Sequence, residues 1–377
     1  MRILHLGKYY APERGGIESY TQALCEWTAA RGQAVSALVH QRPGIWRTTR
    51  ETIDGIDVRR VACIAAPVYA PVSPTYPLAL SGALREFEPD VLHLHLPNPS
   101  CFALLASARA RRVPWVVHWH SDIPPDAPDW RLRTGYRVYK PFEQALLKRA
   151  AAVVATSDAY LDASIALAPW RAKARVIALG AGDVAQPPPR RDLWPDGDGV
   201  RWLAVGRLSH YKGFDVLLRA LANVPAARLV IVGEGECANA LRATATEAGV
   251  ADRVRFAGAV DDATLLAAYA GADAFALPSL NRGEAFGLVL LEAMRAGLPV
   301  VASAIPGSGI SEVVADGETG LLVPPGDATA LASALARLGD AGVRAHMGAR
   351  GRERFEARFT LERSAACWLQ LYEDVLR

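Results

Sequence analysis

The sequence lacks the features that mark several common classes of protein. Nowhere do about 18 consecutive apolar residues follow one another, so no membrane-spanning helix is expected. Before Lys8 the N-terminus has one basic residue and a very short apolar stretch, which is too little for a signal peptide. The five cysteines are odd in number, widely scattered and without the spacing of metal ligands. Together these absences predict a cytoplasmic protein with reduced thiols.

Two further absences concern the chemistry that the chain performs. The glycine fingerprint GxGxxG is missing, which argues against an NAD-dependent dehydrogenase. The only D-x-D runs from Asp196 to Asp198, inside a PDGDG segment that turn chemistry explains fully. Because clustered carboxylates for Mg²⁺ or Mn²⁺ are lacking, we expect neither a metal nor another cofactor. The net charge of +3 does not indicate nucleic acid, and no such partner is expected.

The charge is unevenly distributed along the chain. Residues 1–182 hold 22 Lys and Arg against 15 Asp and Glu, whereas residues 183–377 hold 20 against 24. Much of the basic excess lies in residues 131–149, where aromatic and basic side chains interleave. Cations near an anionic membrane contribute about 1 kcal/mol each. This segment therefore predicts either peripheral docking on the inner face of a membrane or an ordinary solvated helix, and the sequence leaves both open.

The length and the order of apolar segments predict a two-domain α/β protein. At 377 residues the chain exceeds the size at which a single core keeps growing. Short apolar runs alternate with helical stretches, which is typical of parallel sheets covered on both faces. Pro and Gly cluster in residues 184–199, which predicts a linker between domains of residues 1–183 and 200–358. The predicted strands lie at 2–6, 34–39, 90–96, 114–120 and 151–157, and at 201–206, 227–235, 253–258, 273–279 and 298–303.

The most informative segment is SLNRGEAFGLVLLEAM. Glu284 lies on a polar turn, and Glu292 follows eight positions later in an apolar helical run that Gly287 opens. Eight residues of helix rise about 12 Å, and free backbone N–H groups between the two carboxylates would offer a site for an anion. The groups concerned are those of Gly287, Leu288 and Val289.

Both glutamates also have plain structural explanations. The helix dipole would favour Glu284 near an N-terminus, and Glu292 could lie on a solvated face. However, Glu292 has apolar neighbours, and a buried carboxylate needs a specific reason. A sugar diphosphonucleoside has hydroxyls at both ends and negative charge in the middle. Two carboxylates flanking a set of N–H groups match that order, which favours a nucleotide-sugar site.

Two cations follow another predicted strand. The run RWLAVGRLSHYKGFDVLLRAL reads as a buried strand, a turn carrying Arg207 and Lys212, and an amphipathic helix. In open α/β sheets ligands bind outside the carboxyl ends of the strands. A guanidinium and an ammonium there would stabilise a departing diphosphate without a metal. Either cation could also be an ordinary solvated loop residue.

The first half of the chain supplies further candidates. Gly15 and Gly16 lie between a strand and a helix, where they would admit a phosphate or sugar close to the backbone or form only a turn. His120 and Asp122 stand at the end of the strand predicted at 114–120. Asp122 would orient the imidazole or bind an acceptor hydroxyl.

Two pairs of histidines each share one side of a strand, namely His118 with His120 and His93 with His95. We expect His118 to pack in the core. His93 and His95 are expected to have a structural role or to hydrogen-bond the acceptor. A zinc site is disfavoured because the four lie on separate strands without convincing ligand spacing.

These motifs resemble the retaining glycosyltransferases of family 4, which have the GT-B fold. The resemblance rests on GGIE, HSD, VGRL followed by KG, EAFGLVLLEAM and GLLVPPGD, which span nearly the whole chain. It implies two Rossmann-like domains whose parallel sheets face an interdomain cleft, with the acceptor bound by the first domain and the nucleotide sugar by the second. It also implies that residues 359–377 form a helix that crosses back to the N-terminal domain.

The resemblance also implies roles for the residues named above. The implied contacts are those of Arg207 and Lys212 with the donor diphosphate, Glu284 with the donor sugar, Glu292 with the ribose, and the backbone of Gly16 and Gly287 with the phosphates or the sugar. His120 would contact the donor sugar and be important for catalysis.

The expected reaction transfers a hexosyl unit from GDP-mannose or a UDP-sugar to a hydroxyl of a lipid-linked saccharide or similar acceptor, with retention at the anomeric carbon. HWHSD most resembles bacterial transferases that extend lipid-linked saccharides, often with mannose. No carboxylate is evidently poised as a nucleophile, which favours front-face substitution. Two alternatives stay open, a non-hydrolysing UDP-sugar epimerase and a catalytically inactive GT-B scaffold.

Overall fold

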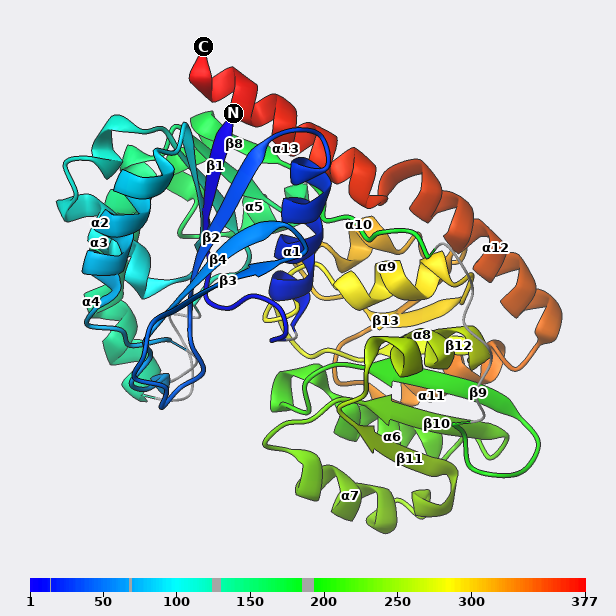
Figure 1. Ribbon diagram of the computed structural model, residues 1–377. Coiled ribbons are helices and arrows are strands. Elements are labelled where there is room, and N and C mark those ends of the chain that lie inside the picture. The colour runs from blue at the N-terminus through cyan, green and yellow to red at the C-terminus, as the bar shows by residue number, and fades with distance from the viewer. Residues whose placement is uncertain (14, 68–69, 124–129, 185–192) are drawn as a thin grey trace. The chain divides into compact units, whose positions relative to one another are not determined.

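The computed structural model describes residues 1–13, 15–67, 70–123, 130–184 and 193–377. The chain forms two compact units (Figure 1), the first made of Met1–Leu179 with Leu361–Arg377 and the second of Gly180–Thr360. Each unit has its own largely parallel sheet, so the predicted α/β class with two parallel sheets is confirmed. Half of the segment predicted as a linker, residues 185–192, lies outside the described residues.

The sheet of the first unit has eight strands in the order β3-β4-β2-β1-β5-β6-β7-β8. All neighbours are parallel except β3, which is antiparallel to β4 at the edge. The strands are β1 (Arg2–Leu6), β2 (Ala34–His40), β3 (Thr49–Ile53), β4 (Ile56–Val61), β5 (Val91–Leu96), β6 (Trp115–Trp119), β7 (Ala152–Ala155) and β8 (Ala174–Val176). The chain starts at β1 in the middle and returns to β5 on its other side, so the direction of strand addition reverses between these two strands.

Helices cover both faces of this sheet. In Figure 1 α2, α3 and α4 lie on one side, and α1 and α13 on the other. The helices are α1 (Gly16–Ala29), α2 (Tyr76–Phe87), α3 (Ala103–Ala106), α4 (Trp130–Arg149), α5 (Asp158–Ala163) and α13 (Leu361–Leu376). Strands buried on both faces must be apolar or hydrogen-bonded throughout, and all six residues of β5 are buried.

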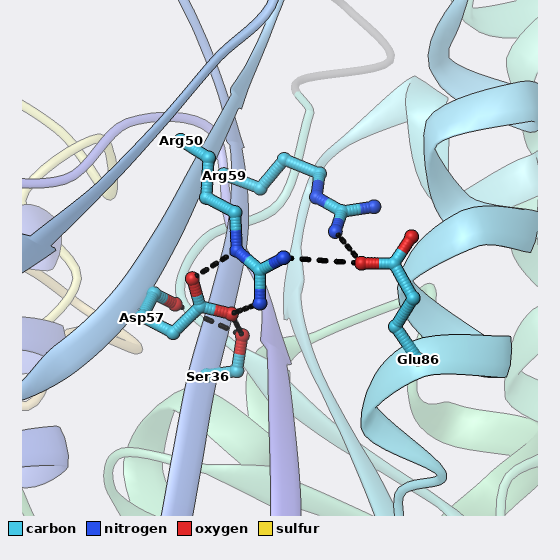
Figure 2. A network of polar contacts seen from close by, with 5 residues as sticks. All are labelled: Ser36, Arg50, Asp57, Arg59 and Glu86. Atoms are coloured by element: carbon cyan, nitrogen blue, oxygen red, sulfur yellow. Dashed lines mark hydrogen bonds and ion pairs between the residues drawn. The ribbon is translucent and has the colours of Figure 1, made fainter.

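The edge strand β3 is a part of the sheet that the sequence analysis missed. Asp54 and Gly55 join it to β4 with φ of 48° and 82°, and two central residues with positive φ are typical of a tight two-residue hairpin turn. A polar network then ties the hairpin to β2 and α2 (Figure 2). Its hydrogen bonds link Arg50 Nε to Asp57 Oδ1 (2.7 Å), Arg50 Nη1 to Glu86 Oε2 (3.1 Å), Arg59 Nη2 to Glu86 Oε2 (2.6 Å) and Ser36 Oγ to Asp57 Oδ2 (3.2 Å).

The last helix of the chain, α13, completes the core of the first unit. Trp368 and Tyr372 on this helix are fully buried. The Trp368 indole N–H donates to the Tyr20 hydroxyl at 2.9 Å, and the same hydroxyl lies 2.7 Å from Ser364 Oγ. Because α13 is apolar on one face and supplies these polar partners, its docking places residues from the two ends of the sequence in one core.

The sheet of the second unit has six strands, all parallel, in the order β11-β10-β9-β12-β13-β14. Its strands are β9 (Val200–Val205), β10 (Ala227–Val232), β11 (Val254–Gly258), β12 (Ala274–Leu277), β13 (Val300–Ser303) and β14 (Gly320–Val323). Its helices are α6 (Phe214–Leu221), α7 (Ala238–Glu247), α8 (Asp262–Gly271), α9 (Leu288–Arg295), α10 (Ile310–Val313), α11 (Ala328–Arg337) and α12 (Ala341–Arg358). The direction of strand addition reverses between β9 and β12, which are neighbours. Ligands of open parallel sheets bind outside the carboxyl ends of strands at such a point.

The packing of α13 predicts the effect of truncating its central tryptophan. Trp368→Ala removes a fully buried ring and leaves the Tyr20 hydroxyl without its indole donor, so the free energy of unfolding of the first unit should fall by about 3–5 kcal/mol. Guanidinium unfolding followed by circular dichroism measures this change. Leu376→Ala, which truncates an exposed side chain of the same helix, is the control and should leave the transition in place. An unaltered transition in Trp368→Ala would show that α13 does not stabilise this core.

Candidate active site

In the second unit, the loops that follow β9 and β12 pack against each other. The Leu280 N–H donates to the Tyr211 carbonyl oxygen at 2.7 Å. Gly213 adopts φ of 64°, and a Cβ at this position would lie 2.1 Å from the Pro278 carbonyl oxygen. Only glycine therefore fits here, and its absence of a side chain lets the two loops approach.

The contact between these loops brings Lys212 and Glu284 together, although 72 positions separate them in the sequence. Lys212 Nζ lies 2.6 Å from Glu284 Oε2, and Ser279 Oγ donates to the same oxygen at 3.0 Å. Both charged side chains are about nine-tenths buried. An ion pair at this depth leaves a costly unpaired charge if either partner is removed.

Burial by itself would lower the pKa of Lys212, but the Glu284 carboxylate outweighs it and the net pKa is raised. The stabilisation that this shift provides is fully present below the usual lysine pKa and is lost only as the pH rises through the raised value. The ammonium is thus charged at every physiological pH. Arg207, exposed on the same loop, acts on Lys212 in the opposite direction because it is a like charge. The site therefore presents two cations with one carboxylate.

Gly287 and the start of α9 lie in the loop after β12. Gly287 has φ of 83°, and a Cβ there would come within 2.8 Å of Leu290 Cδ1. The N–H groups of Leu288 and Val289 belong to the first turn of α9, where the helix itself offers them no acceptor. The predicted helical rise between Glu284 and Glu292 is wrong, because α9 begins only at Leu288 and the residues before it form turns and bends.

Glu292, in the middle of α9, has a partner that the sequence analysis did not foresee. The Tyr269 hydroxyl donates to Glu292 Oε2 at 2.7 Å. Burial raises the pKa of the Glu292 carboxyl, and the bond from Tyr269 acts against that rise. Tyr269 lies on α8, two elements before α9, and gives no signal in the spacing of the two glutamates, so this contact could not be predicted from the motif.

The candidates of the first unit lie around the carboxyl ends of β1, β5 and β6. Gly15 precedes α1 with φ of 179°, an extended conformation that any residue adopts, and Gly16 is the first residue of the helix. His120 follows β6 directly, and its N–H donates to the Leu96 carbonyl oxygen at 3.0 Å. Asp122 Oδ1 accepts bonds from Trp119 Nε1 (2.9 Å) and Ser164 Oγ (2.7 Å), so this carboxylate fixes the turn after β6.

His120 belongs to a buried cluster of five histidines on three neighbouring strands. The sequence analysis named four of them and missed His5 on β1, which pairs in register with His93 on β5. His95 on β5 likewise pairs with His118 on β6. Burial lowers the pKa of His5 and of His120 to about 3, and it lowers the pKa of the other three as well. All five rings are therefore neutral at physiological pH.

Comparison with known families places these loops in context. The family described as "Glycosyl transferase 4-like domain" matches residues 15–180, and the family "Glycosyl transferases group 1" matches residues 190–354. A D-rhamnosyltransferase, WbpZ of Pseudomonas aeruginosa, is 32% identical, over 96% of this chain and 92% of its own. This chain belongs to the group 1 glycosyltransferases.

Other relatives of this glycosyltransferase span almost its full length. The phosphatidyl-myo-inositol mannosyltransferase of Mycobacterium leprae is 33% identical, over 90% of this chain and 87% of its own. Among solved structures, sucrose-phosphate synthase from Thermosynechococcus elongatus superposes with a TM-score of 0.81 and 26% identity, over 99% and 98% of the two chains. HepE of Anabaena, in complex with UDP and glucose, gives a TM-score of 0.77 at 22% identity, over 99% of each chain. These similarities confirm the GT-B fold.

The environment of Glu292 predicts a difference between stability and binding in the glycosyltransferase. Because the pKa of Glu292 is raised, the folded state binds more protons than the unfolded chain, and stability falls as the pH rises above the usual glutamic acid pKa. Glu292→Gln removes the charge and keeps an acceptor for Tyr269, so its melting temperature at pH 7.5 should equal or exceed that of the wild type. The difference should vanish near pH 4, as thermal unfolding at both pH values would show.

If Glu292 binds the ribose of the donor, the same variant should bind nucleoside diphosphates more weakly in spite of its stability. Glu247→Gln, an exposed change at the end of α7, serves as the control for both measurements. A drop of several degrees in the melting temperature of Glu292→Gln at pH 7.5 would contradict the assigned effect of burial.

Proposed function

We propose that this glycosyltransferase transfers a hexosyl unit from a nucleoside diphosphate sugar to a hydroxyl of a lipid-linked saccharide or a similar acceptor, with retention and without a metal. The observation that carries the proposal is the buried Lys212–Glu284 pair, with Arg207 on the same loop, at the point where strand addition reverses. Fixed cations at this place match a diphosphate leaving group, whose charge grows as the glycosidic bond breaks.

The remaining groups of the second unit fit the other parts of such a donor. The first-turn N–H groups of α9, at Leu288 and Val289 after Gly287, would bind phosphate oxygens. Glu284 would orient the sugar hydroxyls while holding the ammonium of Lys212 in place. Glu292, in the middle of α9, would accept hydrogen bonds from the ribose hydroxyls.

The proposed mechanism is a front-face substitution at the anomeric carbon. The bond from that carbon to the diphosphate oxygen breaks, and the acceptor oxygen bonds to the same face of the sugar. The acceptor proton passes to the departing diphosphate, which Arg207, Lys212 and the backbone N–H groups stabilise. In the first unit, His120 would contact the donor sugar, the backbone of Gly15 and Gly16 would admit it closely, and Asp122 would act through the turn that it fixes.

Named relatives support the donor and acceptor classes. The similar proteins include a rhamnosyltransferase, a phosphatidyl-myo-inositol mannosyltransferase and an O-antigen chain mannosyltransferase from Escherichia coli. HepE has also been solved with UDP-glucose. These names favour GDP-mannose or a UDP-sugar as the donor and a lipid-linked saccharide as the acceptor of this chain.

The outer surface of α4 supports docking on an anionic membrane, which we include in the proposal. Trp130, Val138 and Phe142 are 63%, 67% and 48% exposed, and Arg133, Arg137 and Lys140 on the same helix are exposed as well. Apolar side chains beside cations are typical of helices that lie in the interface of a bilayer. Within the described part of the chain, no helix is both long and apolar enough to pass through a bilayer. We therefore propose a cytoplasmic enzyme bound peripherally to the inner face of the membrane.

Removing one of the two cationic side chains that would bind the diphosphate tests the proposed reaction. In an assay of transfer from radiolabelled donors, Arg207→Ala should lower kcat by roughly 10²- to 10³-fold, because one fixed charge is withdrawn from the leaving group. Arg219→Ala, an exposed arginine of α6 in the same unit, is the control and should retain activity. EDTA should leave the wild-type rate unchanged. Full activity in Arg207→Ala, or loss in EDTA that Mg²⁺ restores, would refute this mechanism, and a new sugar nucleotide formed without acceptor would indicate an epimerase.

The membrane proposal makes a separate prediction for liposome flotation. The protein should float with vesicles that contain anionic lipid and remain at the bottom with neutral vesicles. Changing Arg133, Arg137 and Lys140 of α4 to glutamate should abolish flotation, because each contributes about 1 kcal/mol near an anionic surface. The control changes three exposed arginines of the second unit, Arg242, Arg337 and Arg350, to glutamate. Flotation that is indifferent to anionic lipid, or lost equally in both triple variants, would contradict docking through α4.

A further inference from the structure

Three of the five clustered histidines are connected in a row by their ring nitrogens. His5 Nδ1 lies 3.1 Å from His95 Nε2, and His95 Nδ1 lies 3.0 Å from His120 Nε2. The three rings come from β1, from β5 and from the end of β6, and all are at least nine-tenths buried. His120, at 6% exposure, is the outermost ring and lies beside the carboxyl ends of the strands.

The direction of the hydrogen bonds in this row of histidines follows from counting the protons on their ring nitrogens. A neutral imidazole has one N–H and one acceptor nitrogen, so His95 can donate to only one of its two neighbours and must accept from the other. Both contacts are satisfied only when all three rings point the same way. Either His120 donates inward to His95 and His95 to His5, or His5 donates outward to His95 and His95 to His120.

His5, the innermost ring of the hydrogen-bonded row, decides between these two directions. His5 Nε2 is buried and has no hydrogen-bond partner among the described residues. In the inward arrangement this nitrogen would carry a buried N–H without an acceptor, whereas in the outward arrangement it carries only an unused lone pair. Orphaned N–H groups are the rarer case in native proteins, so the outward direction is favoured. The Thr21 hydroxyl, 3.4 Å from His95 Nδ1, can donate or accept and does not alter this choice.

We propose that His5 and His95 are positioning residues that fix His120 as the tautomer with its proton on Nδ1. Because His95 donates to His120 Nε2, that nitrogen is an acceptor. Nδ1 of His120 therefore carries the proton and presents an N–H toward substrate. An N–H at this place donates to an oxygen of the sugar and stays a donor throughout turnover. The tautomer of His120 is inferred independently of the proposed function, and only the contact of its N–H with the sugar rests on that function.

A metal ion is the competing explanation for so many buried imidazoles. One ligand atom each from His95, His118 and His120 can be chosen so that all lie within 4.8 Å of one another, and the same holds for His5, His93 and His95. A tetrahedral zinc with bonds of about 2.0–2.1 Å needs nitrogens roughly 3.4 Å apart, whereas His95 Nδ1 and His120 Nε2 lie at a hydrogen-bonding distance of 3.0 Å and would have to separate to bind one ion together. The positive charge of Lys8 also acts on His120, and it would repel a cation in the first of these triads. The hydrogen-bonded chain needs no such movement and is therefore the arrangement that we favour.

The test is nitrogen NMR of protein labelled with ¹⁵N in its eight histidines, assigned with single-site variants. In the wild type at pH 7.5, His5, His95 and His120 should each appear as the neutral Nδ1–H tautomer. An Nε2–H tautomer at any of the three would overturn the proposal, and this result does not depend on any variant folding. One equivalent of bound zinc, nickel or copper in tag-free protein, lost in His118→Phe, would also overturn it.

Two phenylalanine variants separate positioning from packing. His95→Phe keeps an aromatic ring but removes both nitrogens of the central link, so His120 should shift toward the Nε2–H tautomer. His118→Phe is the matched control. The His118 ring packs against the His120 ring with centroids 3.9 Å apart at an angle of 38°, while neither nitrogen of His118 has a hydrogen-bond partner among the described residues. The His120 tautomer should be unchanged in His118→Phe. If both variants shift the His120 tautomer equally, or if neither shifts it, the proposed row of hydrogen bonds from His5 through His95 to His120 would be contradicted.

Kinetics then tests the role of His120 itself. His95→Phe should lower kcat by roughly 10- to 100-fold with little change in the donor KM, the range known for groups that orient a metal-bound histidine. A shifted tautomer with unchanged kcat would uphold the chain and remove His120 from the proposed catalytic set. An unshifted tautomer would overturn the chain whatever the activity, so the two failures are distinguishable.

Discussion

The ion pair between Lys212 and Glu284 is the interaction on which the second unit's site depends. Two charges this deeply buried are tolerated only when each compensates the other and further hydrogen bonds support the pair. Here Ser279 Oγ donates to the same Glu284 oxygen that contacts Lys212. The pair also fixes the loop after β9 to the loop after β12, together with the Gly213 contact that only a residue without a side chain permits. The same contact therefore serves the fold and the site, because the loop packing that buries the ion pair also holds the Lys212 ammonium on the loop of Arg207.

The same topological rule operates in both units. Each sheet begins in its middle, adds strands on one side and then returns to the other, so the loops at the reversal cannot be covered by a crossover helix. In the second unit these loops hold the charged pair, whereas in the first unit four of the five histidines lie within β1, β5 and β6, and His120 follows β6. The charged pair therefore lies at the reversal itself, whereas the strand histidines are buried in the sheet beside it.

Much of this architecture could be predicted because it is encoded locally. Ten predicted strands coincide with observed ones within a few residues, and the helix expected in residues 359–377 is observed as α13 at Leu361–Leu376. The hairpin β3–β4 carried a local turn signal, Asp54-Gly55. However, charged residues alternate with other residues along its strands, and the partners of these charges, such as Glu86, are distant in sequence. The pairing of Lys212 with Glu284, the bond from Tyr269 to Glu292 and the place of His5 in the cluster all depend on strand order, which periodicity does not specify. Motif spacing also assumed a full helical rise between Glu284 and Glu292, whereas α9 begins only at Leu288, after Gly287 with its positive φ.

Calorimetric titration of the full chain with GDP, UDP, ADP and dTDP in metal-free buffer tests directly whether the loops around Lys212 and Glu284 bind a diphosphate. One of these nucleoside diphosphates should bind clearly more tightly than the others, and Lys212→Met, in a folded protein, should lose this binding. Absence of binding by all four, or binding that is unaffected in Lys212→Met, would contradict the assignment of the Lys212–Glu284 loop as a diphosphate site.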